Sequence, residues 1–213
     1  MYYVLNVVGR IKDMIKEMNQ TKAFKLLEKR ESVFLNQVKD AINIANDMLP
    51  QINNVFNTYT IHGMKHSINV AEYMFELIDD AEKMSDLELV MLIYAALFHD
   101  SGMIVSNDEI MEIKKDKILL GNRKYSKVLE KYGDEKVALQ ECVRPVHGFR
   151  VKKIIESLME DNKQIFLIPE TTNIFFNNEL ALICQAHNED FSWIMHNLKY
   201  DTMKSKYDLN AQF

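Results

Sequence analysis

Four histidines and one aspartate of this 213-residue chain stand where apolar, helix-like segments begin or end. His66 and His147 open such segments, His187 closes one, and His99 closes the most apolar one and is followed by Asp100. Because helices bury their apolar faces together, polar residues at their ends can converge on one cleft. Imidazoles and a carboxylate are ligands for zinc, iron, manganese and nickel. Such a carboxylate can bridge two cations, and water held between them becomes a strong nucleophile near neutral pH.

The remaining two of the six histidines lack this setting. His196 has no partner motif and is interpreted as an ordinary hydrogen-bonded residue. His62 stands four residues before His66, so a helix reaching back that far would place it on the same face, at the rim of the site. In contrast, His99 and Asp100 directly follow the apolar segment AALF, where a polar pair is costly to bury without partners. Gly102 is expected to let the chain turn sharply after this pair.

The elements that position these residues are predicted to be helices. Residues 22–49 repeat apolar side chains at spacings of three, four or seven, and Pro50 ends this run. Ser85 and Glu88 have the spacing of a capping box. The segment they introduce, DLELVMLIYAALF, has no polar face and is therefore expected to be a buried central helix.

Further helices are predicted over 106–118, over 122–132, after Pro145 and in ELALICQAH. The segment QIFLIPE fits either a short strand or an extended connector. Only six glycines and three prolines occur, which is few for a sheet protein built on tight turns. The sequence therefore predicts an all-α fold.

Composition limits the class of protein. With 47% hydrophobic residues the chain can bury a core, and its net charge of −5 gives no strong nucleic-acid signature. Cys142 and Cys184 make no disulfide framework. No stretch reaches the roughly 18 apolar residues that a membrane helix needs, and the first residues lack the order of a secretory signal. We expect a soluble, cytoplasmic protein.

The histidine motifs resemble those of the HD-domain superfamily of metal-dependent phosphohydrolases. HSINVAEYM and AALFHDSGM resemble its first His and its His-Asp doublet, and RPVHGFRVKKII and ICQAHNED resemble two further histidine motifs of members that hold two metals. The resemblance covers roughly residues 55–190 and implies an HD-type helical bundle. It implies one or two divalent transition-metal ions (Mn, Fe, Ni or Zn) held by two sets of ligands that share one residue: His66, His99 and Asp100, and Asp100, His147 and His187.

The resemblance also implies a reaction, which is hydrolysis of a phosphoester in a nucleotide-like substrate by metal-activated water. Asp100 would take part in catalysis through the metals. Arg144 and Arg150 flank His147 at helical distance, and we expect them to clamp the substrate phosphate, since a guanidinium binds it bidentately.

Two positions depart from the family pattern. The last metal ligand of the family is an aspartate on a late helix, and here the only late aspartates, Asp201 and Asp208, lie outside the expected apolar context. The chain is therefore expected to be a fragment or a shortened member. Asn188 stands where two-metal members often have a second histidine, and its oxygen would be a weaker ligand. An alternative is thus a catalytically inactive HD-fold binding or regulatory module with a partial metal site.

The expected organisation is an N-terminal helical extension over 1–50 and an HD-type domain over 51–213. The residues before the first motif resemble a subgroup in which a helical lead-in precedes the HD region, often joined to a C-terminal GHKL-type ATPase domain. A homodimer, or a fused or partner domain, is therefore a further expectation. A third hypothesis is a structural partner domain whose N-terminal helices form an interface.

Overall fold

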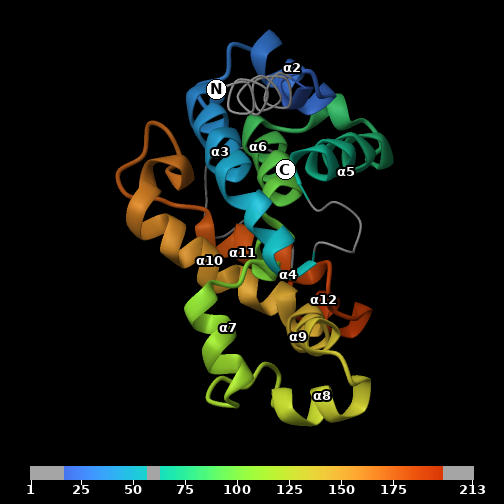
Figure 1. The fold of residues 1–213 in the computed structure, drawn as a ribbon. Helices are drawn as coiled ribbons and strands as arrows, with labels where there is room; N and C mark the ends of the chain where they lie inside the picture. The colour runs from blue at the N-terminus through green and yellow to red at the C-terminus, as the bar shows by residue number, and fades with distance from the viewer. Residues whose placement is uncertain (1–16, 57–62, 199–213) are drawn as a thin grey trace, which may run out of the picture.

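The computed structural model describes residues 17–56 and 63–198, and helices make up its regular structure (Figure 1). The prediction of an all-α fold is confirmed, because the described residues contain no strand and only two isolated β-bridges. The first half contains α2 (Lys22–Lys29), α3 (Leu35–Met48), the 3-10 helix η1 (Leu49–Ile52), α4 (Asn53–Phe56), α5 (Met64–Leu77), η2 (Ala81–Lys83) and α6 (Asp86–Phe98). The second half contains η3 (Ser101–Met103), α7 (Asn107–Lys114), α8 (Tyr125–Tyr132), α9 (Glu135–Val143), η4 (Arg144–Val146), α10 (His147–Asn162), η5 (Lys163–Phe166), α11 (Asn177–Ala186) and α12 (Phe191–Asn197).

The helical run predicted over 22–49 is divided into α2 and α3. Glu31 has a positive φ of 52° and so leaves the helical conformation. The amide of Ser32 donates to the carbonyl of Leu27, and the amide of Glu31 donates to the carbonyl of Glu28. These two bonds form a Schellman motif, which satisfies the last carbonyls of α2 and ends it.

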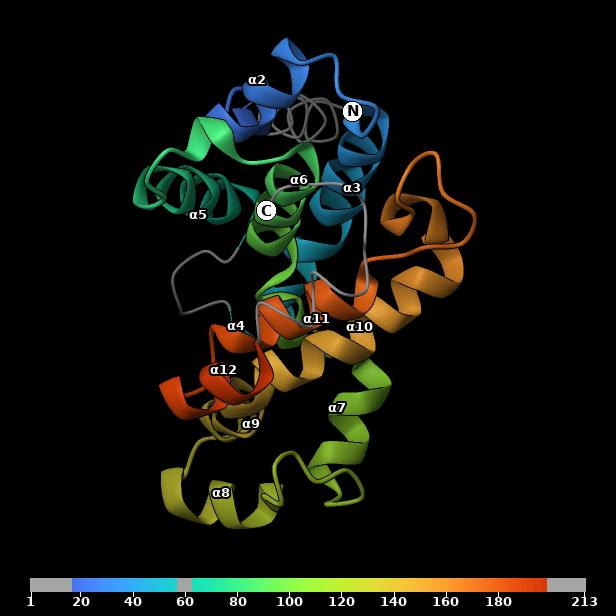
Figure 2. The same ribbon diagram turned by 180° about the vertical axis from the view of Figure 1, so that it is seen from behind.

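The central helix is α6, as its apolar sequence predicts. The side chain of Ser85 accepts from the amide of Glu88 at 3.3 Å, and the Glu88 carboxylate accepts from the amide of Ser85 at 2.6 Å, so the capping box is confirmed. Nine of its residues are buried. Helix α6 lies between α3 and α5 (Figure 1 and Figure 2) and packs against α2, α3, α5 and α11.

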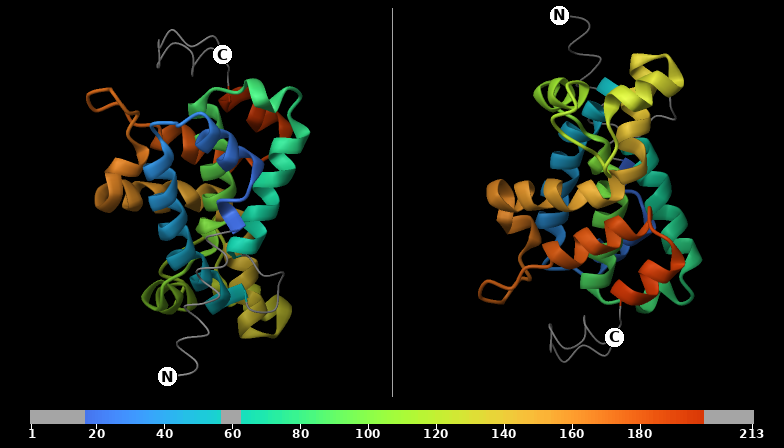
Figure 3. Two further views of the ribbon diagram at one scale, coloured as in Figure 1. Left: turned by 90° about the horizontal axis from the view of Figure 1, so that it is seen from above. Right: turned by 90° about the horizontal axis from the view of Figure 1, so that it is seen from below.

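The second half of the chain builds a layer across the end of α6. Helices α10 and α11 lie side by side, as the view from below shows (Figure 3), and α10 also packs against η3. Helices α7 and α8 form the end of the molecule opposite α2 (Figure 1). Helix α9 was not predicted, although Asp134 caps it by accepting from the amide of Val137 at 2.8 Å.

The ambiguous segment QIFLIPE belongs to neither a regular strand nor a helix throughout. Its first residues form η5, and the next residue, Leu167, makes an isolated bridge to Phe175. The Tyr94 hydroxyl of α6 lies 2.9 Å from the carbonyl of Ile165 and 3.0 Å from that of Gln37 on α3. Tyr94 thus connects three segments that are distant in the sequence.

One hydrophobic cluster runs through the described residues, from α2 to α11. Cys142 and Cys184 are both free and buried within it. Within residues 17–56 and 63–198, no single helix is long and apolar enough to cross a membrane, although Asp86–Met103 and Asn107–Lys114, bent by 45°, pass that test together. The expected domain boundary at residue 50 falls inside η1 and stays a prediction.

Candidate metal centre

The His-Asp doublet lies where α6 leaves the core. His99 is the C-cap of α6, and the Asp100 side chain that follows is only 9% exposed. Asp100 Oδ2 lies 3.1 Å from His99 Nε2 and 3.3 Å from His66 Nε2, which comes from the first turn of α5. These three residues form a group that could hold a metal ion, and we call it the first ligand set.

The other carboxylate oxygen of Asp100 faces a second pair of histidines. Asp100 Oδ1 lies 3.6 Å from His147 Nε2, at the start of α10, and 3.7 Å from His187 Nε2, at the end of α11. The two histidine Nε2 atoms are 2.7 Å apart. In both sets the ligand atoms lie within 4.8 Å of one another. The structure therefore brings all five predicted ligands together, with Asp100 shared.

Three of the four imidazoles are oriented by backbone carbonyls. The Nδ1 atoms of His99, His147 and His187 each contact the carbonyl three residues earlier in the chain, at 3.1 Å for His99 and 2.6 Å for His147. A carbonyl can only accept a hydrogen bond, so in the neutral imidazole Nδ1 carries the proton and Nε2 keeps its lone pair. This is the arrangement that orients histidines as metal ligands.

The two ends of the centre have different electrostatics. The hydrogen bond that the His66 imidazole donates to the Asp100 carboxylate raises the pKa of His66, although partial burial opposes the shift. Burial lowers the pKa of His187 and so favours the neutral imidazole that a metal ion needs. The side chains of His66 and His187 are 37% and 30% exposed, so solvent reaches the centre past these two residues.

This donor set fits a divalent transition metal, because neutral imidazole nitrogens and a buried carboxylate converge on two adjacent points. The HD-CE family model matches residues 56–213, which is more than half of the chain and includes all five ligands. The chain belongs to the HD-CE family. The resemblance to HD-domain proteins is thereby confirmed. No curated protein and no solved structure matches the chain.

The two arginines that flank His147 in the sequence have different surroundings. The Arg144 side chain is 49% exposed and contacts the carboxylate of Glu141 at 2.9 Å. The Arg150 side chain is only 11% exposed and is engaged by Glu109 and by two carbonyls at η3. Their expected contact with a substrate phosphate stays a prediction.

Asn188 of the HD-CE domain contacts the backbone. Its Oδ1 accepts a hydrogen bond from the amide of Gly148, in the first turn of α10, at 3.3 Å. A Cβ atom on Gly148 would lie 2.5 Å from Asn188 Cβ, so only glycine lets α10 and the end of α11 approach so closely. Gly102 has a similar role, because its Cβ would lie 1.9 Å from the carbonyl oxygen of His147. The absence of a side chain at Gly102 thus allows η3 to pack closely against α10.

The structural contacts of two residues near the histidine centre were not predicted from the sequence. Glu109 is 41 positions from its partner Arg150, and Asn188 was considered only as a ligand. The spacing of Ser106 and Glu109 does mark a helix start, but nothing local identifies the distant arginine. His196 is exposed on α12, whereas His62, Asp201 and Asp208 lie outside the described residues.

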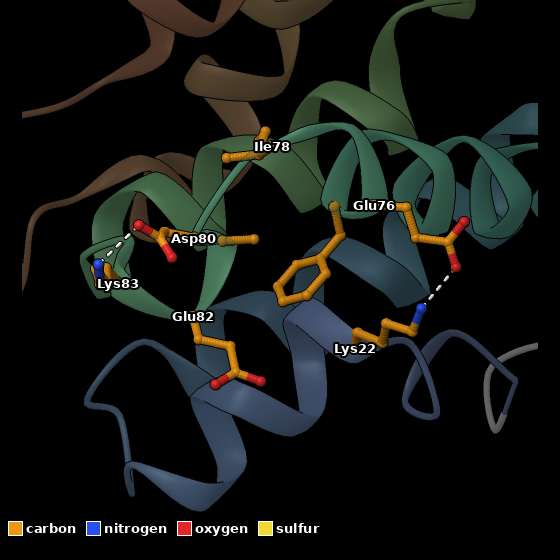
Figure 4. Close-up of a pocket in the computed structure, with 8 residues that line it drawn as sticks. Lys22, Glu76, Ile78, Asp80, Glu82 and Lys83 are labelled. Atoms are coloured by element: carbon orange, nitrogen blue, oxygen red, sulfur yellow. Dashed lines mark hydrogen bonds and ion pairs between the residues drawn. The ribbon is translucent and has the colours of Figure 1, made fainter.

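A surface pocket lies apart from these residues, beside α2, α5 and η2 (Figure 4). Its lysines are engaged by neighbouring carboxylates, since Lys22 Nζ lies 2.6 Å from Glu76 and Lys83 Nζ lies 2.7 Å from Asp80. None of its lining residues belongs to either ligand set. The pocket is therefore separate from the histidine centre.

Proposed function

We propose that this HD-CE domain hydrolyses a phosphoester of a nucleotide-like small molecule, using one or two divalent transition-metal ions. The observation that supports this is the position of Asp100, which presents one carboxylate oxygen to each pair of histidines. A bound metal ion would supply positive charge for the phosphoryl oxygens and lower the pKa of a water molecule. The ligands would be the five residues of the two sets.

The residues of the chain would prepare the centre for this chemistry. The carbonyl contacts at Nδ1 hold His99 and His147 in the orientation that a ligand requires. Asp100 is shielded from water, which strengthens its attraction for cations. Arg144 would contact the phosphate, because its exposed ion pair with Glu141 costs only about 0–1 kcal/mol to exchange.

Metal content tests the first half of this proposal. The protein would be purified without chelator or His-tag, and its metal measured by plasma mass spectrometry beside Asp100→Ala and Asp108→Ala. Asp108 is exposed on α7 and is the control. We expect about two equivalents in the wild type and in the control, and a loss in Asp100→Ala, as a shared bridging ligand requires. Absence of metal in the wild type, even after incubation with transition metals, would contradict a metal centre.

Turnover tests the second half. Phosphodiesters and nucleoside mono- and triphosphates would be screened with Mn²⁺ or Ni²⁺. Release of product by the wild type, and none by Asp100→Ala, is the expected result. Metal that is bound without any turnover would instead favour an inactive binding or regulatory module. That alternative is supported by Asn188, whose oxygen contacts a backbone amide and leaves three protein ligands in the second set.

A further inference from the structure

The Arg150 guanidinium is held by four contacts within the protein. Its Nη1 and Nη2 atoms donate to the two carboxylate oxygens of Glu109, at 2.6 and 3.1 Å. Nε donates to the carbonyl of Gly102 at 2.8 Å, and Nη2 also donates to that of Ile104 at 2.9 Å. The two side chains are only 11% and 19% exposed. A planar guanidinium is the side chain that can satisfy a carboxylate bidentately and still reach further acceptors.

These contacts join η3 and α10, two of the three elements that adjoin the second ligand set. Gly102 belongs to η3, which starts directly after Asp100, and Arg150 follows His147 by one turn of α10. The same two elements touch at Gly102, where an added Cβ would clash with the His147 carbonyl. The separation of Asp100 Oδ1 and His147 Nε2, 3.6 Å, therefore depends on how η3 lies against α10.

The first ligand set does not depend on this contact. His99 and Asp100 are neighbours in the chain, and His66 comes from α5, which packs directly against α6. A shift of α10 against η3 would change the distance between Asp100 and His147, while the distances among His66, His99 and Asp100 would stay the same.

We propose that Arg150, through its ion pair with Glu109, is a positioning residue that sets the affinity of the Asp100, His147 and His187 set for a second metal ion. This inference rests on the proposed metal centre and assigns Arg150 a task that needs no substrate. Residues that orient metal ligands typically change metal affinity by about 10- to 100-fold when they are replaced. Here the change is confined to one of two ions.

The test compares Arg150→Lys and Glu109→Gln with two exposed neighbours, Lys152→Gln on α10 and Asp108→Asn on α7. Lysine keeps the charge of Arg150 but lacks the planar fork, and glutamine keeps the shape of Glu109 but lacks its charge. Mn²⁺ affinities are measured by calorimetry on the metal-free full chain. We expect Arg150→Lys and Glu109→Gln to bind the second ion about 10- to 100-fold more weakly, with the first ion and both controls unchanged.

Arg150→Lys is also combined with each of two further variants, which identify the metal ion whose affinity it changes. In His147→Gln, which already lacks the second set, Arg150→Lys should cause no further loss of Mn²⁺ affinity. In His66→Gln, which damages the first set, it should weaken the ion that remains. Hydrogen exchange gives a readout without metal, because the amides of Met103 and Ile104 donate to the carbonyls of Asp100 and Ser101 within the turn. These amides should exchange faster in Arg150→Lys.

Other outcomes overturn the proposal. Equal weakening of both ions would show that Arg150 supports the fold in general, and unchanged affinities with unchanged exchange would show that it positions nothing. A wild type that binds two ions but hydrolyses no phosphoester contradicts the proposed function and leaves this inference intact. A wild type that binds one ion contradicts this inference but not the proposed function, and one that binds none contradicts both; the wild-type titration alone distinguishes these cases.

Discussion

Asp100 lies between one histidine whose pKa is raised and one whose pKa is lowered, so protons and metal ions compete unequally across the centre. The hydrogen bond to Asp100 makes His66 bind its proton more tightly in the folded metal-free protein than in the unfolded chain. The pair therefore stabilises the metal-free fold below the ordinary histidine pKa of about 6.5, and this contribution is lost as pH rises through the higher folded-state value.

Because the pKa of His66 is raised in the folded state, the stability of the metal-free protein should depend on pH. We expect the melting temperature of the wild type to exceed that of His66→Gln at a pH of about 6, and the difference to shrink by a pH of about 8. Mn²⁺ affinity should rise over the same range, because the metal needs the neutral imidazole of His66. Thermal melts and calorimetry at each pH provide the measurements. A difference that grew with pH would contradict the stabilising role of the protonated pair.

Among Gly102, Gly121, Gly133 and Gly148, an added methyl group would make its closest contact at Gly102. The added Cβ of Gly102→Ala would meet the backbone carbonyl of His147 at 1.9 Å, and no side-chain rotation relieves a clash with backbone. We expect the free energy of unfolding to fall by about 1–3 kcal/mol and the second metal ion to bind more weakly. Denaturant titration and calorimetry measure the two effects.

The matched control for this change is Gly133→Ala. Gly133 has a φ of +67° but no atom within 4 Å of an added Cβ. It should therefore cost about 1–2 kcal/mol through its left-handed backbone alone and leave metal binding unchanged. Wild-type metal affinity in Gly102→Ala would mean that the close approach of η3 to α10 does not shape the centre.

At the scale of helices, local signals predicted where elements start more reliably than where they end. The capping box at Ser85 is a strong signal, because two reciprocal hydrogen bonds need only residues three apart. The break at Glu31 has no comparable signal, since glycine is the usual residue at such a position and glutamate is not. Helix α9 was missed because its apolar residues lack a clear stripe, and only the cap at Asp134 marks it.

The same limit applies to contacts between helices. The five ligands could be predicted because each lies at the end of an apolar segment within a recognisable motif. The contact between Asn188 and Gly148 spans 40 positions and depends on how α10 lies against α11. No periodicity or cap encodes that packing, so the sequence suggested a weak ligand where the structure has a link between helices.

This link between α10 and α11 yields a prediction of its own. Asn188→Ala removes the acceptor for the Gly148 amide and should lower the free energy of unfolding by about 0.5–1.5 kcal/mol. It should also weaken the second metal ion, because His147 and His187 lie on the two helices that it joins. Asn188→Asp keeps an acceptor at the start of α10 and should retain more stability. Equal stability of the alanine and aspartate variants, measured by urea titration, would contradict the role of this hydrogen bond.

At the scale of the whole molecule, the helices within the HD-CE match (residues 56–213, here called the HD helices) and the helices before residue 56 share one hydrophobic cluster. Residues of α2 and α3 belong to the same hydrophobic cluster as α6 and α11. A division at residue 50 is visible in the sequence, because Pro50 ends an amphipathic run. Whether two units meet there stays a prediction, although α6 packs against helices from both sides of residue 50.

Tyr94 tests whether this shared core unfolds as one unit. Its hydroxyl contacts the carbonyls of Gln37 and Ile165, and burial raises its pKa, which keeps the hydroxyl protonated as a donor. Tyr94→Phe keeps the ring and removes this donor. We expect a single urea transition whose free energy falls by about 1–3 kcal/mol, with metal content unchanged. Tyr73→Phe, at an exposed position on α5, is the control and should unfold as the wild type does.

The shape of the urea unfolding curve shows whether the chain unfolds as one unit or as two. If α3 and the HD helices unfold together, loss of the Tyr94 hydroxyl shifts the whole curve and leaves its slope unchanged, because the same surface is exposed on unfolding. A curve that splits into two steps would mean that α3 separates from α6 before the HD helices unfold, and that the boundary at residue 50 divides two units. Fluorescence of Trp193 on α12 and circular dichroism of all helices would then report different midpoints, whereas a single unit requires that they coincide.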